Sequence, residues 1–338
     1  MEHRIRDFWI GGYAAPGEAG VVRAALDARG GLSIVEENRE LDRPSWLLRS
    51  EKRPLLYAAE ELCPEGNLAA LRLTEEGPRL AARVGTGGAD PCHIAFAPGG
   101  RHLLVANYTG GSLAVVELDG EGLPRGLSDL KQHRAEGPTR GGPARQDGPH
   151  VHFSRAVGDR VWVADLGLNR IIGYRWDGER GRLGDVDEVI AFHDGAGPRH
   201  FDISPDGQFM AALCELDGTL HILRREGGLW RRKQVAFTRE GGCGAGETAA
   251  AVRYDGPGAL VASVRGWDRV VRFDVGPDGL LSGRRDFPAG GRTPRDVRPA
   301  GEWLLAANQD SDWIAVLDRD GNAAGGMRCV RPTCICEG

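Results

Sequence analysis

Histidine, arginine and glutamate residues recur at two fixed places in a repeated pattern of this chain. One place follows an apolar segment that ends in small residues, and it holds Glu61, Tyr108, Leu166, Glu215, Arg265 and Gln309. The other place is the start of each repeat, which holds His93, His150 with His152, Arg199 with His200, and Arg295. Arginine offers a fork of donors to phosphate or carboxylate groups, and histidine or a glutamate of shifted pKa can act as a general base. Brought together, such residues would bind an anion and activate water.

The repeat that must position these residues has the length of a propeller blade. Copies begin at Pro91, Pro149, Pro198, Thr248 and Pro294, with a weaker copy at Pro44. Equivalent positions recur every 44 to 58 residues, at Glu60, Asn107, Asp165, Cys214, Val264 and Asn308. This interval is typical of a four-stranded blade.

Each copy contains the sequence features of strands and tight turns. Runs such as HLLVAN (102–107) and RVWVAD (160–165) suit strands buried on both faces. Segments such as APGG (97–100) and SPDG (204–207) supply turn residues. We therefore predict an all-β fold, a single domain over residues 1–338, built as a seven-bladed β-propeller of four-stranded antiparallel blades. Six blades are visible as repeats, and FWIGGY (8–13) with MRCVRPTCIC (327–336) would form the seventh and close the ring.

Composition sets limits on location and partners. The net charge of -5 predicts no nucleic-acid partner and no membrane partner. The seven cysteines are scattered without paired spacing, which argues against a disulfide framework. The first residues have no apolar segment typical of a secretory signal, and no run of about 18 apolar residues occurs. We expect a cytoplasmic protein that is a monomer or a weak homodimer.

Several motifs, in a fixed order, resemble those of a known family. They are RQDGPHVH (145–152), VADLGLNR (163–170), GAGPRHFDISPDG (195–207), CEL (214–216), TPRDV (293–297) and ANQDS (307–311). In this order they resemble the lactonase-type seven-bladed propellers, which include 6-phosphogluconolactonases and a fungal enzyme that cyclises carboxymuconate. The likeness runs over roughly residues 8–320.

The resemblance implies a site at one mouth of the central channel. It implies four catalytic residues: His152, Arg199, Glu215 and Arg265. Substrate contacts are expected from the neighbouring repeat positions His93, His150, Arg295, Gln309 and Tyr108. We hypothesise that His152 or Glu215 activates water, that Arg199 stabilises the oxyanion, and that Arg265 and Arg295 hold an anionic substrate.

The expected reaction is hydrolysis of 6-phospho-D-glucono-1,5-lactone in the oxidative pentose phosphate pathway, without a metal or another cofactor. One alternative is a lactonase or cycloisomerase that acts on an unphosphorylated carboxylate or sugar lactone. A second is a non-enzymatic propeller that binds proteins, and a third is a metal-dependent gluconolactonase-type propeller. These alternatives stay open because one fold hosts many chemistries.

Structural roles compete with the functional ones at several of these positions. His93, His150, His200 and Arg295 could serve in hydrogen bonds between blades, and Glu215 with Arg265 could be a plain buried ion pair. The chain also departs from the family at three places. Cys214 and Val264 stand where relatives usually have Asn, and TAAAV (248–252) lacks an acidic residue. An insertion at about 119–148 could be a lid over the channel mouth or an ordinary connection.

Overall fold

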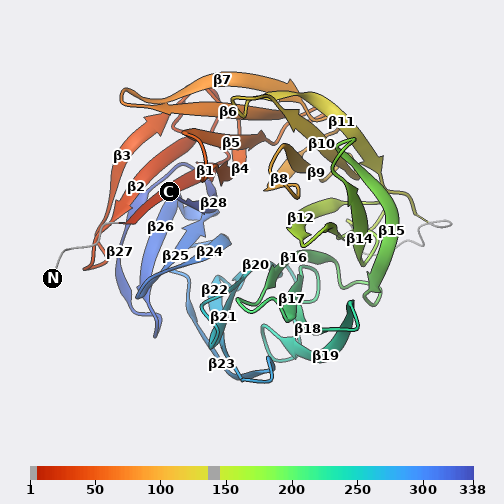
Figure 1. Cartoon of the computed structure of the whole chain (residues 1–338). Coiled ribbons are helices and arrows are strands. Elements are labelled where there is room, and N and C mark those ends of the chain that lie inside the picture. The colour runs from red at the N-terminus through yellow and green to blue at the C-terminus, as the bar shows by residue number, and fades with distance from the viewer. Residues whose placement is uncertain (1–5, 136–144) are drawn as a thin grey trace.

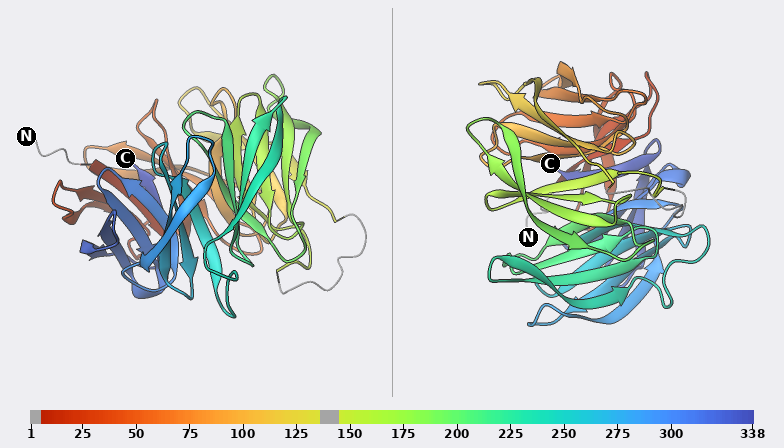
Figure 2. Two further views of the ribbon diagram at one scale, coloured as in Figure 1. Left: turned by 90° about the horizontal axis from the view of Figure 1, so that it is seen from below. Right: turned by 90° about the vertical axis from the view of Figure 1, so that its right-hand side faces the viewer.

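Seven four-stranded antiparallel sheets surround a central axis in the computed structural model, which describes residues 6–135 and 145–338 (Figure 1). Within these residues the chain forms strands β1 to β28 and a single 3-10 turn, η1 (Gln309–Ser311). The side views of Figure 2 show a ring whose strands run obliquely between its two faces. The predicted seven-bladed β-propeller is confirmed. In the described part of the chain, no helix is long and apolar enough to cross a bilayer.

In six blades the strands follow one another along the chain, from the innermost to the outermost. The innermost strands are β4 (Pro44–Arg49), β8 (Pro91–Phe96), β12 (Val151–Val157), β16 (Pro198–Ile203), β20 (Thr248–Tyr254) and β24 (Pro294–Ala300). The second strands are β5 (Leu55–Glu60), β9 (His102–Asn107), β13 (Arg160–Asp165), β17 (Phe209–Cys214), β21 (Ala259–Arg265) and β25 (Trp303–Asn308). The third strands are β6 (Asn67–Thr74), β10 (Ser112–Leu118), β14 (Arg170–Asp177), β18 (Thr219–Glu226), β22 (Arg269–Val275) and β26 (Trp313–Asp318). The outer strands are β7 (Gly77–Gly85), β11 (Pro124–Gln132), β15 (Arg182–Ala191), β19 (Leu229–Phe237), β23 (Leu281–Pro288) and β27 (Ala323–Arg328).

The seventh blade joins the two ends of the chain, as the sequence predicts. The C-terminal strand β28 (Pro332–Glu337) is its innermost strand and pairs with β1 (Arg6–Gly12), followed by β2 (Val21–Leu26) and β3 (Leu32–Asn38). The predicted boundary of the C-terminal segment was wrong by a few residues. Met327 and Arg328 belong to the outer strand β27 of the preceding blade, where Met327 pairs with Ile314. The closing strand therefore starts only at Pro332.

The hydrophobic core lies between neighbouring blades. The cluster between the blade of β8 to β11 and the blade of β12 to β15, for example, combines Leu104 and Val115 with Val161 and Val163 from the next sheet. Second strands such as β9 and β13 are buried over almost their whole length. This burial on both faces explains why their sequences are continuous apolar runs rather than alternating patterns.

Every innermost strand has a β-bulge close to its start. In β16, for example, Pro198 pairs with Cys214 and His200 with Leu213, so Arg199 is the extra residue. A bulge bends the strand and re-aims the side chain of its extra residue. The extra residues of the seven blades are Ser45, Cys92, His152, Arg199, the pair Ala250 and Ala251, Arg295 and Thr333.

The insertion predicted at about 119–148 is for the most part not an insertion. Residues 124–132 form β11, the regular outer strand of its blade. Residues 136–144, on which a lid would depend, lie outside the described residues. Residues 145–150 then lead into β12 at the channel mouth.

Candidate active site

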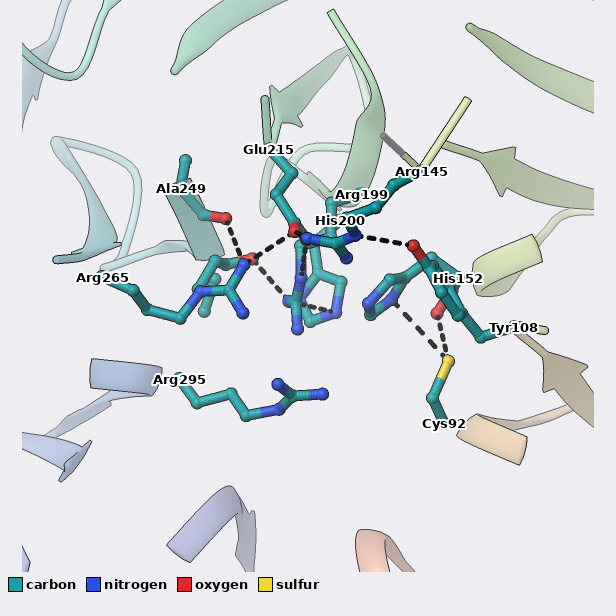
Figure 3. A network of polar contacts seen from close by, with 12 residues as sticks. Cys92, Tyr108, Arg145, His152, Arg199, His200, Glu215, Ala249, Arg265 and Arg295 are labelled. Carbon is teal, nitrogen blue, oxygen red and sulfur yellow. Dashed lines mark hydrogen bonds and ion pairs between the residues drawn. The ribbon is translucent and has the colours of Figure 1, made fainter. Parts of the chain in front are cut away.

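The carboxylate of Glu215 lies at the centre of a cluster of arginine side chains at one mouth of the channel (Figure 3). The residue is fully buried, and its Oε2 atom lies 2.7 Å from Nε of Arg199. Its Oε1 atom lies 2.9 Å from Nη2 of Arg265 and also accepts a hydrogen bond from Nη1 of Arg145. Three guanidinium groups from separate parts of the sequence thus share one carboxylate.

Backbone geometry brings these groups together. Arg199 is the bulge residue of β16, while Glu215 directly follows β17 and donates its backbone N–H to the Gly197 carbonyl at 2.7 Å. Arg265 is the last residue of β21 in the next blade. Because innermost strands start where second strands end, both kinds of position lie at the same mouth. The two recurring places in the sequence are therefore neighbours in space.

Backbone carbonyls of the TAAAV segment accept further hydrogen bonds from the same arginines. Nη1 of Arg199 donates to the Ala250 carbonyl at 2.7 Å and also contacts Nε2 of His200 at 2.9 Å. Nη2 of Arg265 donates to the Ala249 carbonyl at 3.3 Å. Carbonyl groups of β20 thus bind these arginines in a segment that has no acidic side chain.

Arg295 approaches the cluster from the other side of the mouth. It is the bulge residue of β24, and Figure 3 shows its guanidinium pointing toward the same centre. Its Nη2 atom is 4.0 Å from Oε1 of Glu61, and its guanidinium lies 5.0 Å from the centre of the Tyr13 ring. Tyr13 donates its hydroxyl to Glu61 at 2.7 Å. Arg295 is thus held more loosely than Arg199.

His152 is the bulge residue of β12 and lies next to the cluster. Its ring centre is 5.3 Å from that of His200 and 5.5 Å from that of Tyr108, and its Nδ1 atom is 3.9 Å from Sγ of Cys92. Burial and the positive charge of Arg199 hold the pKa of His152 well below its usual range. The imidazole is therefore neutral at neutral pH.

The arginines keep Glu215 ionised. Burial by itself would raise the pKa of Glu215, but Arg265, Arg199 and Arg145 lower it to about 2. Burial lowers the pKa of Arg199 to about 9 against the opposing effect of Glu215, so the guanidinium remains a cation at neutral pH. The mouth therefore combines four cations with the carboxylates of Glu215 and Glu61, and it has a positive field that attracts anions.

The four other predicted contact residues differ in their surroundings. Tyr108 accepts a hydrogen bond from Nε of Arg145 at 2.9 Å and stacks on His150, with ring centres 4.6 Å apart. His93 lies among aromatic rings, 4.0 Å from Phe153 between ring centres, and its Nδ1 accepts the Ser154 N–H at 3.3 Å. The Gln309 side chain donates to Asp310 at 3.0 Å.

These positions differ in how they could reach a substrate. Tyr108 lies beside the arginine cluster, whereas His93 is enclosed by side chains of the protein. Substrate contact stays a prediction for Tyr108, His150, His93 and Gln309. The four predicted catalytic residues do lie together, but their roles in catalysis also remain predictions.

Two residues of the cluster were not predicted from the sequence. Arg145 stands in the RQDGPHVH motif but before β12, in a connection whose path the repeat pattern does not define. Cys92 is the bulge residue of β8, and a one-residue bulge is not visible in sequence. The signal for Arg145 was its place at the start of a motif that otherwise supplies His150 and His152.

Within the described residues, no group of three or more His, Cys, Asp or Glu side chains is placed to hold a metal ion. All seven cysteines, which lie in this part of the chain, are free thiols. A reaction without a metal or cofactor stays a prediction.

Comparisons with known proteins agree with this architecture. The 6-phosphogluconolactonase of Bacillus subtilis is 26% identical over 325 residues, which cover 92% of this chain and 90% of that protein. A protein of Lactobacillus plantarum of known structure superposes with a TM-score of 0.89 at 25% identity, covering 99% of this chain and 100% of the other. The periplasmic gluconolactonase of Pseudomonas aeruginosa shares the fold, with a TM-score of 0.86 at 24% identity and coverage of 99% and 98%. The family model "Lactonase, 7-bladed beta-propeller" matches residues 7–329, and the chain belongs to this family.

Proposed function

We propose that the protein hydrolyses 6-phospho-D-glucono-1,5-lactone to 6-phosphogluconate at the arginine-lined mouth of the channel. The observation that carries this proposal is the fully buried Glu215 carboxylate with Arg145, Arg199 and Arg265 around it and Arg295 close by. A phosphorylated lactone is an anion, and its opening develops further negative charge on the carbonyl oxygen. The named B. subtilis relative supports this substrate. This activity would place the protein in the oxidative pentose phosphate pathway.

His152 is the general base that we propose. In the reaction, the oxygen of water forms a bond to the lactone carbonyl carbon while its proton passes to the imidazole. The bond between this carbon and the ring oxygen then breaks, and the ring oxygen takes the proton back from the imidazolium to become a hydroxyl, while the new carboxylic acid ionises to the carboxylate. The neutral state of His152 supports this role.

Glu215 is better suited to hold the arginines than to take a proton. Both of its oxygens are engaged by guanidinium groups, whose charges lower its pKa to about 2, so a proton taken from water would have to displace these ion pairs. We propose that it fixes Arg199 in place, and that Arg199 stabilises the oxyanion. A preorganised donor of this kind contributes roughly 2.7–4 kcal/mol to lowering the barrier. Arg265 and Arg295 would hold the anionic substrate.

The direct test is the rate of opening of freshly prepared phosphorylated lactone, corrected for its spontaneous opening, beside plain gluconolactone. We expect a large acceleration of the phosphorylated substrate and a much higher KM for the plain one. Equal rates with and without protein would contradict the proposal. Preference for the plain lactone would favour the unphosphorylated alternative instead.

Two variants test the assigned roles. His152→Gln should lower kcat by about 10²–10⁴-fold, and Arg199→Ala should lower it by about 10²–10³-fold. Arg72→Ala is the matched control, because Arg72 forms an exposed ion pair with Glu121 far from the mouth. If either site variant keeps the wild-type kcat/KM, the role assigned to that residue is wrong.

A further inference from the structure

Arg145 is the most exposed of the three arginines on Glu215. Its side chain is 39% exposed, against 3% for Arg199 and 12% for Arg265. It comes from the segment that precedes β12, whereas the other two lie on β16 and β21. Figure 3 shows its guanidinium spanning the space between Glu215 and Tyr108. Of these three cations, Arg145 is the one that faces an entering ligand.

The Glu215 carboxylate does not depend on Arg145 for its charge balance. Oε2 is paired with Arg199, and Oε1 is paired with Arg265 as well as with Arg145. If Arg145 moved away, each oxygen would still have one guanidinium partner. Arg199 and Arg265 also donate to the Ala250 and Ala249 carbonyls, so they are fixed in place. Arg145 is thus the exchangeable member of the group.

The Arg145 guanidinium has N–H groups that are free to donate hydrogen bonds to a ligand. Nε donates to the Tyr108 hydroxyl at 2.9 Å and Nη1 donates to Glu215, while Nη2 has no hydrogen-bond partner within residues 6–135 and 145–338. A guanidinium has two parallel N–H groups that match the oxygens of phosphate or carboxylate. Arg145 could therefore form a bidentate contact by turning its outer edge toward an anion.

The backbone of this segment is held firmly although its side chain is exposed. Arg145 has a φ of 87°, a left-handed conformation that is costly for a residue with a Cβ atom. The next residue, Gln146, is buried and donates to Leu166 O at 3.0 Å and Asn169 Oδ1 at 2.7 Å. His150 donates its N–H to Asp165 at 2.9 Å. Strain that the surrounding contacts maintain is typical of functional positions.

We propose that Arg145 is a specificity-determining residue that leaves Glu215 to bind the anionic group of the substrate. This inference rests on the proposed function for the identity of that group, a sugar phosphate. The residue selects a phosphorylated sugar acid or lactone over its plain counterpart. Arg199 and Arg265 stay with Glu215 while Arg145 moves.

Binding of the product anion tests this role separately from catalysis. The dissociation constants of 6-phosphogluconate and gluconate are measured by calorimetry for the wild type, Arg145→Ala, Arg145→Lys and the control Arg72→Ala. In Arg145→Ala we expect the preference for the phosphorylated ligand to fall by about tenfold or more, as for loss of a charge-assisted bidentate contact. Arg145→Lys should restore only part of it, because an ammonium group is a point charge. The melting temperature of Arg145→Ala should stay close to that of the wild type.

The outcomes separate the role of Arg145 from the proposed lactonase function. An unchanged preference in Arg145→Ala, or a wild type with no preference for the phosphorylated ligand, would overturn the role of Arg145. Lactonase activity of the wild type would in that case still support the proposed function. If the wild type binds 6-phosphogluconate through Arg145 but opens no lactone, the inference stands and the proposed function fails.

Discussion

Two groups of largely buried charges lie around the central channel, and they differ in how well their charges and hydrogen bonds are balanced. Deeper along the strands, Arg253 of β20 donates to both oxygens of Asp296 in β24, at 2.9 and 3.0 Å, and to Val297 O. Asp296 also accepts the backbone N–H groups of Val297 and Ile335 at 2.9 Å. One cation thus meets one anion, and the pair ties three blades together.

At the channel mouth, by contrast, the charges are not balanced. Glu215 faces three arginines, and Arg295 adds a fourth cation. Within the described residues, the buried atoms Nε of Arg265, Oε2 of Glu61 and Oε1 of Gln309 have no hydrogen-bond partner. Unsatisfied buried polar atoms are rare in proteins and need an explanation. We therefore propose that Arg253 and Asp296 serve the fold, while the excess of cations at the mouth serves a ligand.

The largest effect on stability is expected at the balanced pair. Asp296→Ala leaves the partly buried Arg253 and the backbone N–H groups of Val297 and Ile335 without the buried carboxylate that binds them, so the free energy of unfolding should fall by about 3–5 kcal/mol. Urea denaturation measures this change. A loss below about 1 kcal/mol would mean that the pair does not hold the blades together.

The next effect concerns Glu215, whose pKa is lowered from 4.5 to about 2 in the folded protein. A depressed carboxylate pKa contributes stability above the unfolded pKa, and this stability is lost as pH falls through the folded pKa. Glu215→Gln should therefore cost roughly 3 kcal/mol at neutral pH. The wild type should lose the same contribution between about pH 4.5 and pH 2. Equal stability of wild type and variant at neutral pH, measured by urea denaturation, would contradict this.

The fold was predicted well from sequence because each blade repeats the same pattern of buried apolar strands. The apolar runs that end at Asn107 and Asp165 are buried strands, and their spacing is enough to count blades. The bulges were not predicted, because pairing register depends on the partner strand and a single extra residue leaves no mark in composition. The end of β27 was misplaced for a related reason. Its sequence AAGGMR lacks the β-branched residues that mark most strands.

A further pH-dependent effect concerns the buried histidines His93, His152 and His200, whose pKa values burial holds well below the usual range. The unfolded chain takes up protons at these sites below about pH 6.5, whereas the folded protein does not. Stability should therefore fall as pH drops below this value, by about 1.4 kcal/mol per pH unit for each histidine.

His93→Phe tests this pH dependence, because a phenyl ring suits its aromatic neighbours Trp46 and Phe153. Urea denaturation at several pH values should give a slope that is shallower by about 1.4 kcal/mol per pH unit than in the wild type. An unchanged slope would show that His93 does not contribute.

The contrast between the two charge groups is tested most directly by removing one arginine from each, as Arg253→Met and Arg295→Met, and by measuring unfolding and lactone hydrolysis for both proteins. We predict that Arg253→Met lowers the free energy of unfolding by several kcal/mol, on the order of 3, while kcat/KM of the folded enzyme stays within about threefold of the wild type. Arg295→Met should keep the stability within about 1 kcal/mol and lower kcat/KM for the phosphorylated lactone by about tenfold or more. The reverse pattern, with Arg295 needed for folding and Arg253 for hydrolysis, would contradict the assignment of the mouth as the active site.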